Sequence, residues 1–334
     1  MDERAEALRQ WAVRELGDSS LELTPASADA SFRRYFRIAH GEETRILMDA
    51  PPPQENVRPF VAIARALFAA GVHVPEVLAE NPAEGFLLLS DLGNRPYLDE
   101  LNEATVERLY GDALGALNSI QVCGPGEGSL PPYDRPLLLN EMALFRDWLL
   151  GRYLDLDAQQ LAPDLDSIFA ALAEQALAQP RVCVHRDYHS RNLMVVAQNN
   201  PGILDFQDAV FGPITYDLVS LLRDCYIAWP RVQVEDWALG FRELAIQSGT
   251  LAPDQVDEKT FLRWFDWMGV QRHLKAAGIF ARLNVRDAKP GYLKDIPRTL
   301  GYIVEVAPGY PELAPLAELI GNRVLPALQQ RLAS

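Results

Sequence analysis

The residues with the clearest capacity for chemistry are Asp187, Asn192 and Asp205, which lie within one short stretch of the sequence. Phosphoryl transfer requires a carboxylate that faces the acceptor hydroxyl, together with hard oxygen ligands for the magnesium ion that accompanies ATP. Asp187 suits the first role, and Asn192 and Asp205 suit the second. Their types and spacing therefore predict a phosphoryl-transfer site that uses ATP and Mg2+.

Neighbouring residues of the same stretch are further candidates. His185 directly follows the apolar residues 182–184, so we expect it to be a buried, hydrogen-bonded scaffold. His189 and Arg191 lie inside the loop and contact either the acceptor substrate or only solvent. Asp208 either joins the metal ligands or caps a turn.

Short strand and helix patterns position these residues. Residues 193–196 and 202–204 read as strands between Asn192 and Asp205, so both ligands are expected where a strand meets a loop. Asp217 heads an apolar helical segment, where a carboxylate most often caps the helix or interacts with its first turn.

The N-terminal part of the chain alternates short strand patterns with helices. We expect helices at Asp2–Leu16 and Val57–Ala70, strands at Leu21–Leu23, Arg34–Ala39, Arg45–Asp49, Val77–Glu80 and Phe86–Ser90, and a turn at Ala28–Ser31. Composition changes at residues 91–94, so a first lobe is predicted at residues 1–92 and a second at residues 93–334.

The second lobe is predicted to be mainly helical. The expected helices are Glu103–Gln121, Leu137–Tyr153, Leu161–Leu177, Tyr216–Ile227, Val232–Ser248, Glu258–Leu283 and Tyr310–Leu332. A small antiparallel sheet followed by a helical region predicts an α+β fold.

Four segments together resemble the signature of the aminoglycoside phosphotransferase and choline kinase-like family, namely residues 86–93, 184–194, 203–209 and 212–218. The resemblance covers nearly the whole chain. It implies a bilobal protein kinase-like fold, with a small antiparallel-sheet N-lobe and a mainly helical C-lobe. It also implies that Asp217 braces the catalytic loop, and that backbone groups of Leu88, Leu89 and Ser90 hold the adenine of ATP.

One position departs from the pattern of that family. Where many relatives carry a Lys or Arg for the phosphates, this chain has Met48, which neither donates a hydrogen bond nor offsets negative charge. Arg33, Arg34 or Arg37 are expected to replace the missing cation. The alternative is a nucleotide-binding module that has lost turnover, but the retention of a base and two metal ligands favours an enzyme.

Within the family, residues 29–37, 47–52 and 185–194 most resemble bacterial kinases that phosphorylate the C1 hydroxyl of N-acetylmuramate and N-acetylglucosamine. The resemblance implies an ATP-dependent sugar kinase that serves peptidoglycan recycling. An anionic acceptor should meet cations. The helical lobe offers several, which form either an anion pocket or ordinary surface charges: Arg223, Arg263, Arg272, His273, Lys275, Arg282 and Arg286.

Two other acceptors are compatible with the sequence. An aminoglycoside would suit the acidic chain, but the acidic residues are spread along it rather than clustered in the C-terminal helices. Choline would need an aromatic cage. Trp229, Trp237, Trp264 and Trp267 are available for one, although helically spaced tryptophans are more often core residues.

Composition excludes several other classes of protein. The net charge of −15 argues against a nucleic-acid partner. No apolar run approaches the roughly 20 residues that span a bilayer, so we expect a cytoplasmic protein without a membrane partner. We also expect a monomer. Cys123, Cys183 and Cys225 are odd in number and lie in apolar surroundings, which predicts buried thiols rather than disulfides or zinc ligands.

Overall fold

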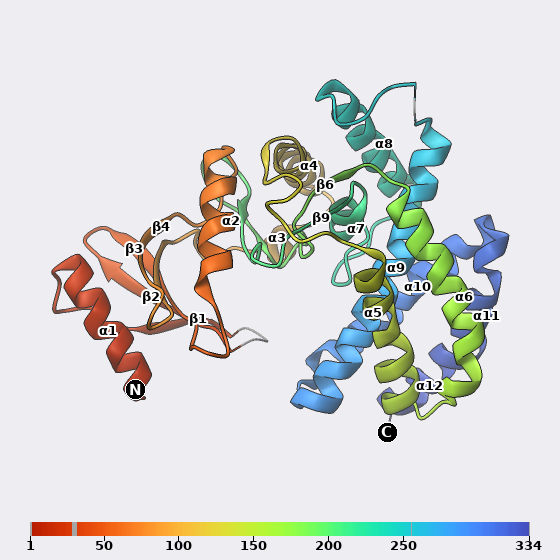
Figure 1. Cartoon of the computed structure of the whole chain (residues 1–334), viewed down its shortest axis with the longest axis horizontal. Helices are drawn as coiled ribbons and strands as arrows, with labels where there is room; N and C mark the ends of the chain where they lie inside the picture. Colours follow the sequence, from red (N-terminus) through yellow and green to blue (C-terminus); the bar gives the residue numbers. More distant parts are fainter. Residues whose placement is uncertain (1, 29–31, 255, 334) are drawn as a thin grey trace. The chain divides into compact units, whose positions relative to one another are not determined.

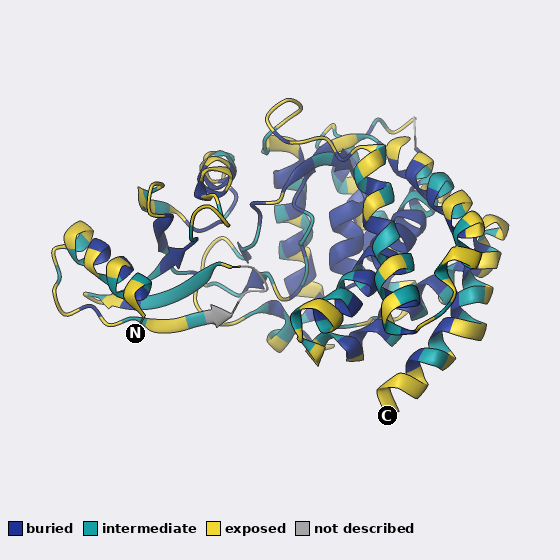
Figure 2. Ribbon diagram, turned by 60° about the horizontal axis from the view of Figure 1, so that its bottom comes forward, coloured by how far each residue is buried: buried dark blue, intermediate teal, exposed yellow. Residues whose placement is uncertain are grey.

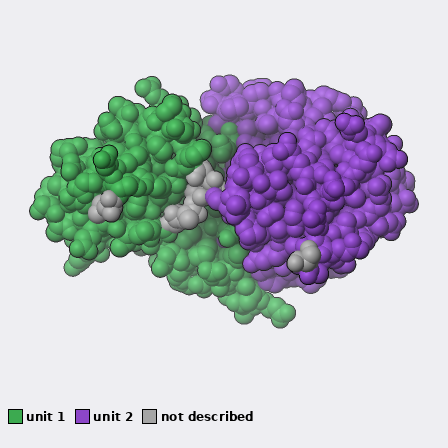
Figure 3. Space-filling model, turned by 90° about the horizontal axis from the view of Figure 1, so that it is seen from below, with its two compact units in different colours: residues 1–125, 191–209 green, residues 126–190, 210–334 purple. Residues whose placement is uncertain are grey.

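The structure is a computed structural model, and it describes residues 2–28, 32–254 and 256–333. The chain forms two compact units, which Figure 3 colours separately. Unit 1 comprises residues 1–125 and 191–209, and unit 2 comprises residues 126–190 and 210–334. The predicted lobe boundary between residues 92 and 93 stays a prediction, because each compact unit combines segments from different parts of the chain.

Unit 1 contains the antiparallel sheet that the sequence predicted, with the strand order β1-β2-β3-β5-β4 (Figure 1). Its strands are β1 (Thr24–Ala28), β2 (Arg34–His40), β3 (Glu43–Asp49), β4 (Val77–Asn81) and β5 (Phe86–Ser90). The strand predicted at residues 21–23 is wrong, because pairing with β2 begins only at Thr24, opposite Arg37. Residues 29–31 of the predicted turn lie outside the described residues.

Helix α1 (Glu3–Leu16) packs on this sheet. The carboxylate of Asp2 caps its first turn by accepting a hydrogen bond from the backbone N–H of Ala5 at 2.7 Å. Gly17 ends the helix with a φ of 68°, a conformation that glycine adopts without steric cost. The apolar face of α1 is buried in a cluster with the sheet, made by Leu8, Trp11, Ala12, Leu21, Ile38, Leu47, Phe86 and Leu88.

The rest of unit 1 is helical apart from one short hairpin. The helices are α2 (Val57–Ala69), α3 (Tyr97–Glu100) and α4 (Val106–Cys123), and the hairpin strands are β7 (Leu193–Met194) and β8 (Gly202–Ile203). Backbone hydrogen bonds attach the hairpin to the N-terminal segments. Val195 donates to the carbonyl of Arg95 at 2.7 Å, and Ile203 donates to that of His73 at 2.8 Å.

Unit 2 is mainly helical and contains one two-stranded sheet, β6 (Arg181–Val184) with β9 (Val210–Pro213). Its α-helices are α5 (Arg135–Leu144), α6 (Ala158–Leu177), α7 (Tyr216–Leu222), α8 (Arg231–Gln247), α9 (Glu258–Asp287), α10 (Ile296–Val306), α11 (Ala314–Leu319) and α12 (Leu325–Ala333). The π-helical segments are η1 (Phe145–Tyr153) and η5 (Ile320–Val324), and the 3-10 turns are η2 (Pro290–Asp295), η3 (Ala307–Gly309) and η4 (Pro311–Leu313).

Helix α9 is the centre of unit 2. Most of its residues between 265 and 283 are buried, and Figure 2 shows dark-blue helices inside this unit. Gly278 allows α5 to approach closely, because a Cβ atom there would lie 2.3 Å from the carbonyl carbon of Leu144. Side chains on α9 are therefore closely packed within unit 2.

Several helix predictions need correction. Helix α7 ends at Leu222 rather than at residue 227, and the Tyr302 hydroxyl donates to the Asp224 and Ile227 carbonyls of the segment that follows. The sequence did not predict α10. The helix predicted at residues 310–332 is divided into shorter segments.

The structure also tests the predictions about thiols and membrane spans. The described residues include three free cysteines, and Cys183 and Cys225 are buried as predicted, but Cys123 is exposed. The prediction for Cys123 was therefore wrong, because it lies in the last turn of α4 on the exposed side of that helix. Among the described helices, none has the length and apolar character to cross a bilayer.

Candidate active site

The loop that carries Asp187 is anchored at its start by Asp217. The loop leaves β6 at His185, and Asp217 stands in the first turn of α7 with no exposed surface. One carboxylate oxygen accepts a hydrogen bond from the backbone N–H of His185 at 2.6 Å, and the other accepts from that of Arg186 at 2.9 Å. These two hydrogen bonds join Asp217 to the loop that carries Asp187, and its bracing role stays a prediction.

Arg186 has an uncommon backbone conformation for a bulky residue, with a φ of 78°. Its guanidinium donates to the carboxylate of the buried Glu141 and lies over the Tyr133 ring, 5.9 Å from the ring centre. Glu141 also pairs with Lys275 at 3.1 Å. Although burial opposes ionisation of Glu141, these two cations hold its pKa below the usual range. The side chain of Arg186 is thus held by a charge network inside unit 2.

Asp187 is suited to accept a proton because it is ionised at neutral pH. Its backbone N–H donates to Nδ1 of His185 at 3.2 Å, and its carbonyl accepts from the N–H of His189 at 3.0 Å. Burial opposes the charge of the carboxylate, but the positive charges around it, above all that of Lys275, lower its pKa overall. His185 is buried, as the sequence predicted.

Asp217 has the opposite electrostatic environment. Burial raises its pKa to about 7, the two backbone hydrogen bonds lower it, and the charge of Asp187 raises it further. The pKa of Asp187 is thus lowered and that of Asp217 is raised. Asp187 therefore keeps its charge over the wider pH range.

A second carboxylate holds the other end of the loop. Asp224 lies just beyond α7 and is buried, and its Oδ2 accepts a hydrogen bond from the backbone N–H of Ser190 at 2.9 Å. The sequence analysis did not predict this role. Its only signal is a carboxylate two residues after the largely apolar residues 218–222, which does not reveal a partner 34 positions away.

In unit 1, Asn192 and Asp205 lie side by side. The amide of Asn192 donates to Asp205 Oδ2 at 3.3 Å, and the amide of Gln207 donates to Asp205 Oδ1 at 2.7 Å. Asp205 has a φ of 67°. The N–H of Leu204 donates to the Asn192 carbonyl at 2.9 Å and so joins the two residues through the backbone.

These donors fit a magnesium ion. The amide oxygen of Asn192 and the carboxylate of Asp205 are hard ligands, and magnesium is usually held by one or two such side chains together with water and substrate phosphates. The described part of the chain contains no cluster of three or more His, Cys, Asp or Glu side chains that could form an all-protein metal cage.

Two of the three candidate arginines, Arg33 and Arg34, are adjacent in the chain but have different partners. Arg34 binds the buried Asp49 at 2.6 Å and also pairs with Asp2, so its guanidinium belongs to the α1 side of the sheet. Arg33 pairs with Glu55 at 3.0 Å. Although burial opposes its charge, Glu55, Asp208 and a neighbouring tyrosine raise its pKa. The charge of Asp208, on the loop that carries Asp205, thus acts on Arg33, whereas the ion pairs of Arg34 are with Asp2 and Asp49.

The other predicted residues are distributed more widely. Leu88, Leu89 and Ser90 lie on β5, an interior strand whose backbone pairs with β3 and β4, so this strand offers adenine few unused groups. Arg191 and Asp208 are exposed. His189 is half-buried, with its ring 5.4 Å from that of Tyr226. Arg37, the third predicted replacement for Met48, pairs with Asp91.

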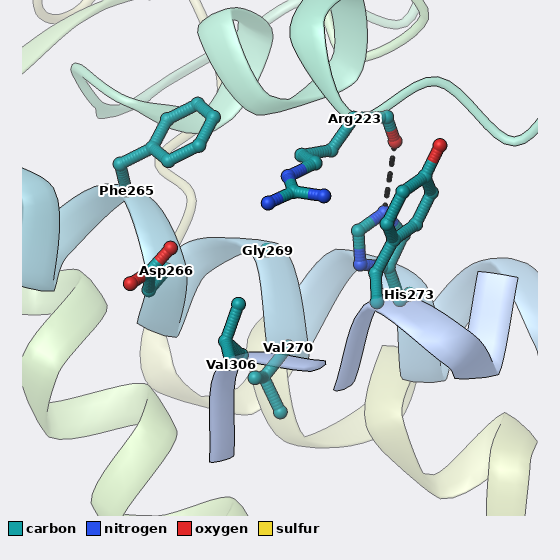
Figure 4. A pocket seen from close by; sticks show the side chains of 8 residues that line it. Arg223, Phe265, Asp266, Gly269, Val270, His273 and Val306 are labelled. Atoms are coloured by element: carbon teal, nitrogen blue, oxygen red, sulfur yellow. Dashed lines mark hydrogen bonds between the residues drawn. The ribbon is translucent and has the colours of Figure 1, made fainter. Parts of the chain in front are cut away.

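A small pocket in unit 2 contains two of the cations that the sequence proposed for an anionic acceptor. It is lined by Arg223, Phe265, Asp266, Gly269, Val270, His273, Tyr302 and Val306 (Figure 4). Its volume of about 10 Å³ suits one water molecule rather than a sugar. Burial lowers the pKa of His273 to about 3, and its neutral ring donates from Nε2 to the Arg223 carbonyl at 2.9 Å.

The fold and these residues agree with membership of a known enzyme class. The model of the phosphotransferase enzyme family matches residues 22–255, and the chain belongs to this family. It is a kinase, and the predicted α+β kinase-like fold is confirmed. An N-acetylmuramate/N-acetylglucosamine kinase of Pseudomonas putida (strain KT2440) is similar to this chain over almost its whole length. It is 47% identical over 334 residues, which cover 96% of this chain and 97% of the relative.

Two further proteins extend the comparison. A relative of the same name from Neisseria meningitidis serogroup B is 44% identical over 332 residues, covering 95% of this chain and 96% of the relative. The crystal structure of choline kinase from Cryptosporidium parvum matches with a TM-score of 0.63 over 94% of this chain and 99% of that chain. At 12% identity it shows the fold alone.

Proposed function

We propose that this kinase transfers the γ-phosphoryl group of ATP to the C1 hydroxyl of N-acetylmuramate and N-acetylglucosamine, for use in peptidoglycan recycling. The observation that carries the proposal is the 47% identity, over nearly all of both chains, to a relative named for these two sugars. The ionised, braced carboxylate of Asp187 supports a hydroxyl as the acceptor, because such a group needs a base.

In the proposed reaction Asp187 orients the C1 hydroxyl and accepts its proton. The sugar oxygen forms a bond to the γ-phosphorus, the bond from that phosphorus to the β,γ-bridging oxygen breaks, and ADP leaves with the bonding electrons. Asn192 and Asp205 would hold magnesium, which offsets phosphate charge when bound. Asp217 and Asp224 keep the loop of Asp187 in place through its backbone N–H groups.

Arg33 is the residue we propose for the phosphates in place of the cation missing at Met48. Met48 is buried and cannot serve. The side chain of Arg33 lies near Asp208, three residues after the proposed magnesium ligand Asp205, and its pair with Glu55 holds it there. Arg34 is less suited, because its guanidinium already binds two carboxylates.

The proposal is tested by supplying Mg-ATP with N-acetylmuramate, N-acetylglucosamine, kanamycin or choline. Acid-labile sugar phosphate is expected from the two amino sugars, because a C1 phosphate hydrolyses readily in acid. Turnover of kanamycin or choline alone would overturn the acceptor and keep the kinase, whereas nucleotide binding without any turnover would support the non-catalytic alternative.

The roles of the site residues are tested by Asp187→Ala and Asp205→Ala. Each variant should lose about 100-fold or more of kcat/KM, as expected for the loss of a general base or a metal ligand. Asp236→Ala is the control, because that carboxylate is exposed on α8. Activity within about tenfold of wild type in either site variant, with folding retained, would contradict the assignment.

A further inference from the structure

Most cations offered by the helical part of the chain are already neutralised by a neighbouring carboxylate. Lys275 pairs with Glu141, and the remaining pairs, at 2.7 to 3.0 Å, are Arg223–Glu305, Arg263–Glu312 and Arg286–Asp287. His273 carries no charge at neutral pH, because burial depresses its pKa. Two arginines of α9 differ from this set, Arg272 and Arg282. Neither has a carboxylate of the described residues within 4.0 Å.

Arg272 is the more unusual of the two because it is almost completely buried, with 6% of its surface exposed. Its hydrogen bond within the described residues is a long one, 3.7 Å from Nη1 to the sulfur of Cys225. Removing a guanidinium from water is costly unless an anion compensates it. Arg282 is half-exposed and lies ten residues, or roughly 15 Å, further along the helix.

The position of Arg272 connects it to the catalytic loop. Cys225, its neighbour, directly follows Asp224, which binds the backbone N–H of Ser190. The charge of Arg272 is also among those that lower the pKa of Asp187. The guanidinium therefore contacts the segment that holds one end of the catalytic loop, and its charge acts on the base that would deprotonate the acceptor.

An aromatic surface adjoins this cation. Tyr226 follows Cys225 in the chain, and its half-buried ring lies 5.4 Å from the ring of His189 and 6.2 Å from that of Phe280. Aromatic rings provide apolar area that suits the C–H face of a pyranose. The base, the aromatic rings and the buried cation are thus linked through short segments of unit 2, because His189 bonds the Asp187 backbone and contacts Tyr226, and Arg272 contacts Cys225 beside Tyr226.

We infer that Arg272 binds the lactyl carboxylate of N-acetylmuramate, while Tyr226 and His189 contact the sugar ring. The inference rests on the proposed function, and it assigns to Arg272 the difference in binding between N-acetylmuramate and N-acetylglucosamine. N-acetylglucosamine has the same ring and the same C1 hydroxyl but lacks the lactyl group, so it uses Asp187 and the aromatic surface without Arg272.

The test compares wild type and Arg272→Gln with both sugars. For N-acetylmuramate, kcat/KM should fall about 10- to 100-fold, the size of a lost charge-assisted hydrogen bond, mainly through KM. For N-acetylglucosamine the loss should be much smaller, because only the contribution of Arg272 to the charge of Asp187 is removed. Arg286→Gln on the same helix is the matched control and should change neither value, because its surface ion pair contributes little.

A change in the substrate supplies an independent test that does not require a variant to fold. The methyl ester of N-acetylmuramate removes the charge from the carboxylate, so wild type should use the ester about 10-fold or more less efficiently than the acid. Arg272→Gln should use the acid and the ester equally. Thermal unfolding verifies that the variant is folded, and Arg272→Lys, which keeps the charge, should retain part of the preference.

Three outcomes would overturn the inference. Equal kcat/KM of wild type for N-acetylmuramate and for its methyl ester would show that no cation binds the lactyl carboxylate. An equal loss for both sugars in Arg272→Gln would show that Arg272 acts on the phosphoryl group or on the loop. No loss for either sugar would show that it is a structural charge. If wild type phosphorylates neither sugar, the proposed function falls and this inference falls with it.

Discussion

Asp49 in the sheet of unit 1 and Asp217 in unit 2 are both carboxylates without exposed surface, yet their partners differ in kind. Asp49 is held by two guanidinium groups, those of Arg4 at 2.7 Å and Arg34 at 2.6 Å. Asp217 is held by two backbone N–H groups of the catalytic loop. Burial alone therefore does not distinguish a scaffold carboxylate from one that positions chemistry, whereas the type of partner does.

Asp217→Ala should have the largest effect and tests whether this carboxylate positions the catalytic loop. The change leaves two loop N–H groups without their acceptor, and each such loss costs about 1–3 kcal/mol. Arg186 would also lose the contact that supports its φ of 78°. We expect kcat to fall about 100-fold, with a much smaller change in the KM for ATP, and steady-state kinetics measure both. A kcat within about threefold of wild type would remove Asp217 from the positioning role.

Asp224→Ala tests the other end of the same loop and should have a smaller effect. Only one loop N–H, that of Ser190, loses its acceptor, so kcat should fall about tenfold. Asp224→Asn keeps one carbonyl oxygen and should recover part of the loss. If the alanine variant melts earlier but turns over at the wild-type rate, the residue is purely structural.

Arg34→Ala tests the scaffold carboxylate through its partner. The change leaves Asp49 buried with Arg4 alone, and because Arg34 is itself partly exposed we expect a loss of about 1–2 kcal/mol in the free energy of unfolding. Turnover at saturating ATP should not change. Chemical denaturation and kinetics together measure this contrast.

Arg33→Ala is the matched comparison for Arg34→Ala, because the two arginines are adjacent in the chain. On the proposed phosphate role it should raise the apparent KM for ATP, with a smaller loss of stability than Arg34→Ala. The opposite pattern, with ATP affinity sensitive to Arg34 and not to Arg33, would reverse the assignment of the two arginines.

The last prediction concerns pH. Because burial raises the pKa of Asp217 from near 4 to about 7, the folded state holds this proton more tightly than the unfolded chain does. Its contribution to stability is therefore fully present below about pH 4 and is lost as the pH rises through about 7, by at most about 1.4 kcal/mol per pH unit. The difference in unfolding free energy between wild type and Asp217→Asn should shrink over this range. A difference that grows with pH would contradict the raised pKa.

The sequence predicted the parts of the structure that depend on local pattern. Alternating apolar residues located β2 to β5 closely, and apolar spacing located α1 and α9. It placed the first strand too early, because the pairing of Thr24 with Arg37 depends on contact between distant residues. It missed α10, although Ile296, Leu300 and Ile303 are spaced at helical intervals and Pro297 in the first turn is compatible with a helix.

In the candidate site, too, the sequence predicted the residues that follow a local pattern and missed those that depend on tertiary packing. The order of residues in one loop was sufficient to predict Asp187, Asn192 and Asp205 as candidates. The choice between Arg33 and Arg34 could not be predicted, because it depends on the charges that each one meets in the folded chain. Asp224 could not be predicted either, since its partner Ser190 is brought to it only by the packing of unit 2.

The shared use of Glu141 by Arg186 and Lys275 also constrains how this protein can evolve. Replacing Glu141 leaves two cations without the anion that they share, at a cost of about 3–5 kcal/mol, a large share of the stability of an ordinary domain. Replacing Arg186 or Lys275 alone still leaves Glu141 paired with the other cation. Descendants of this sequence should therefore exchange either cation more readily than Glu141, even where the acceptor they phosphorylate has changed.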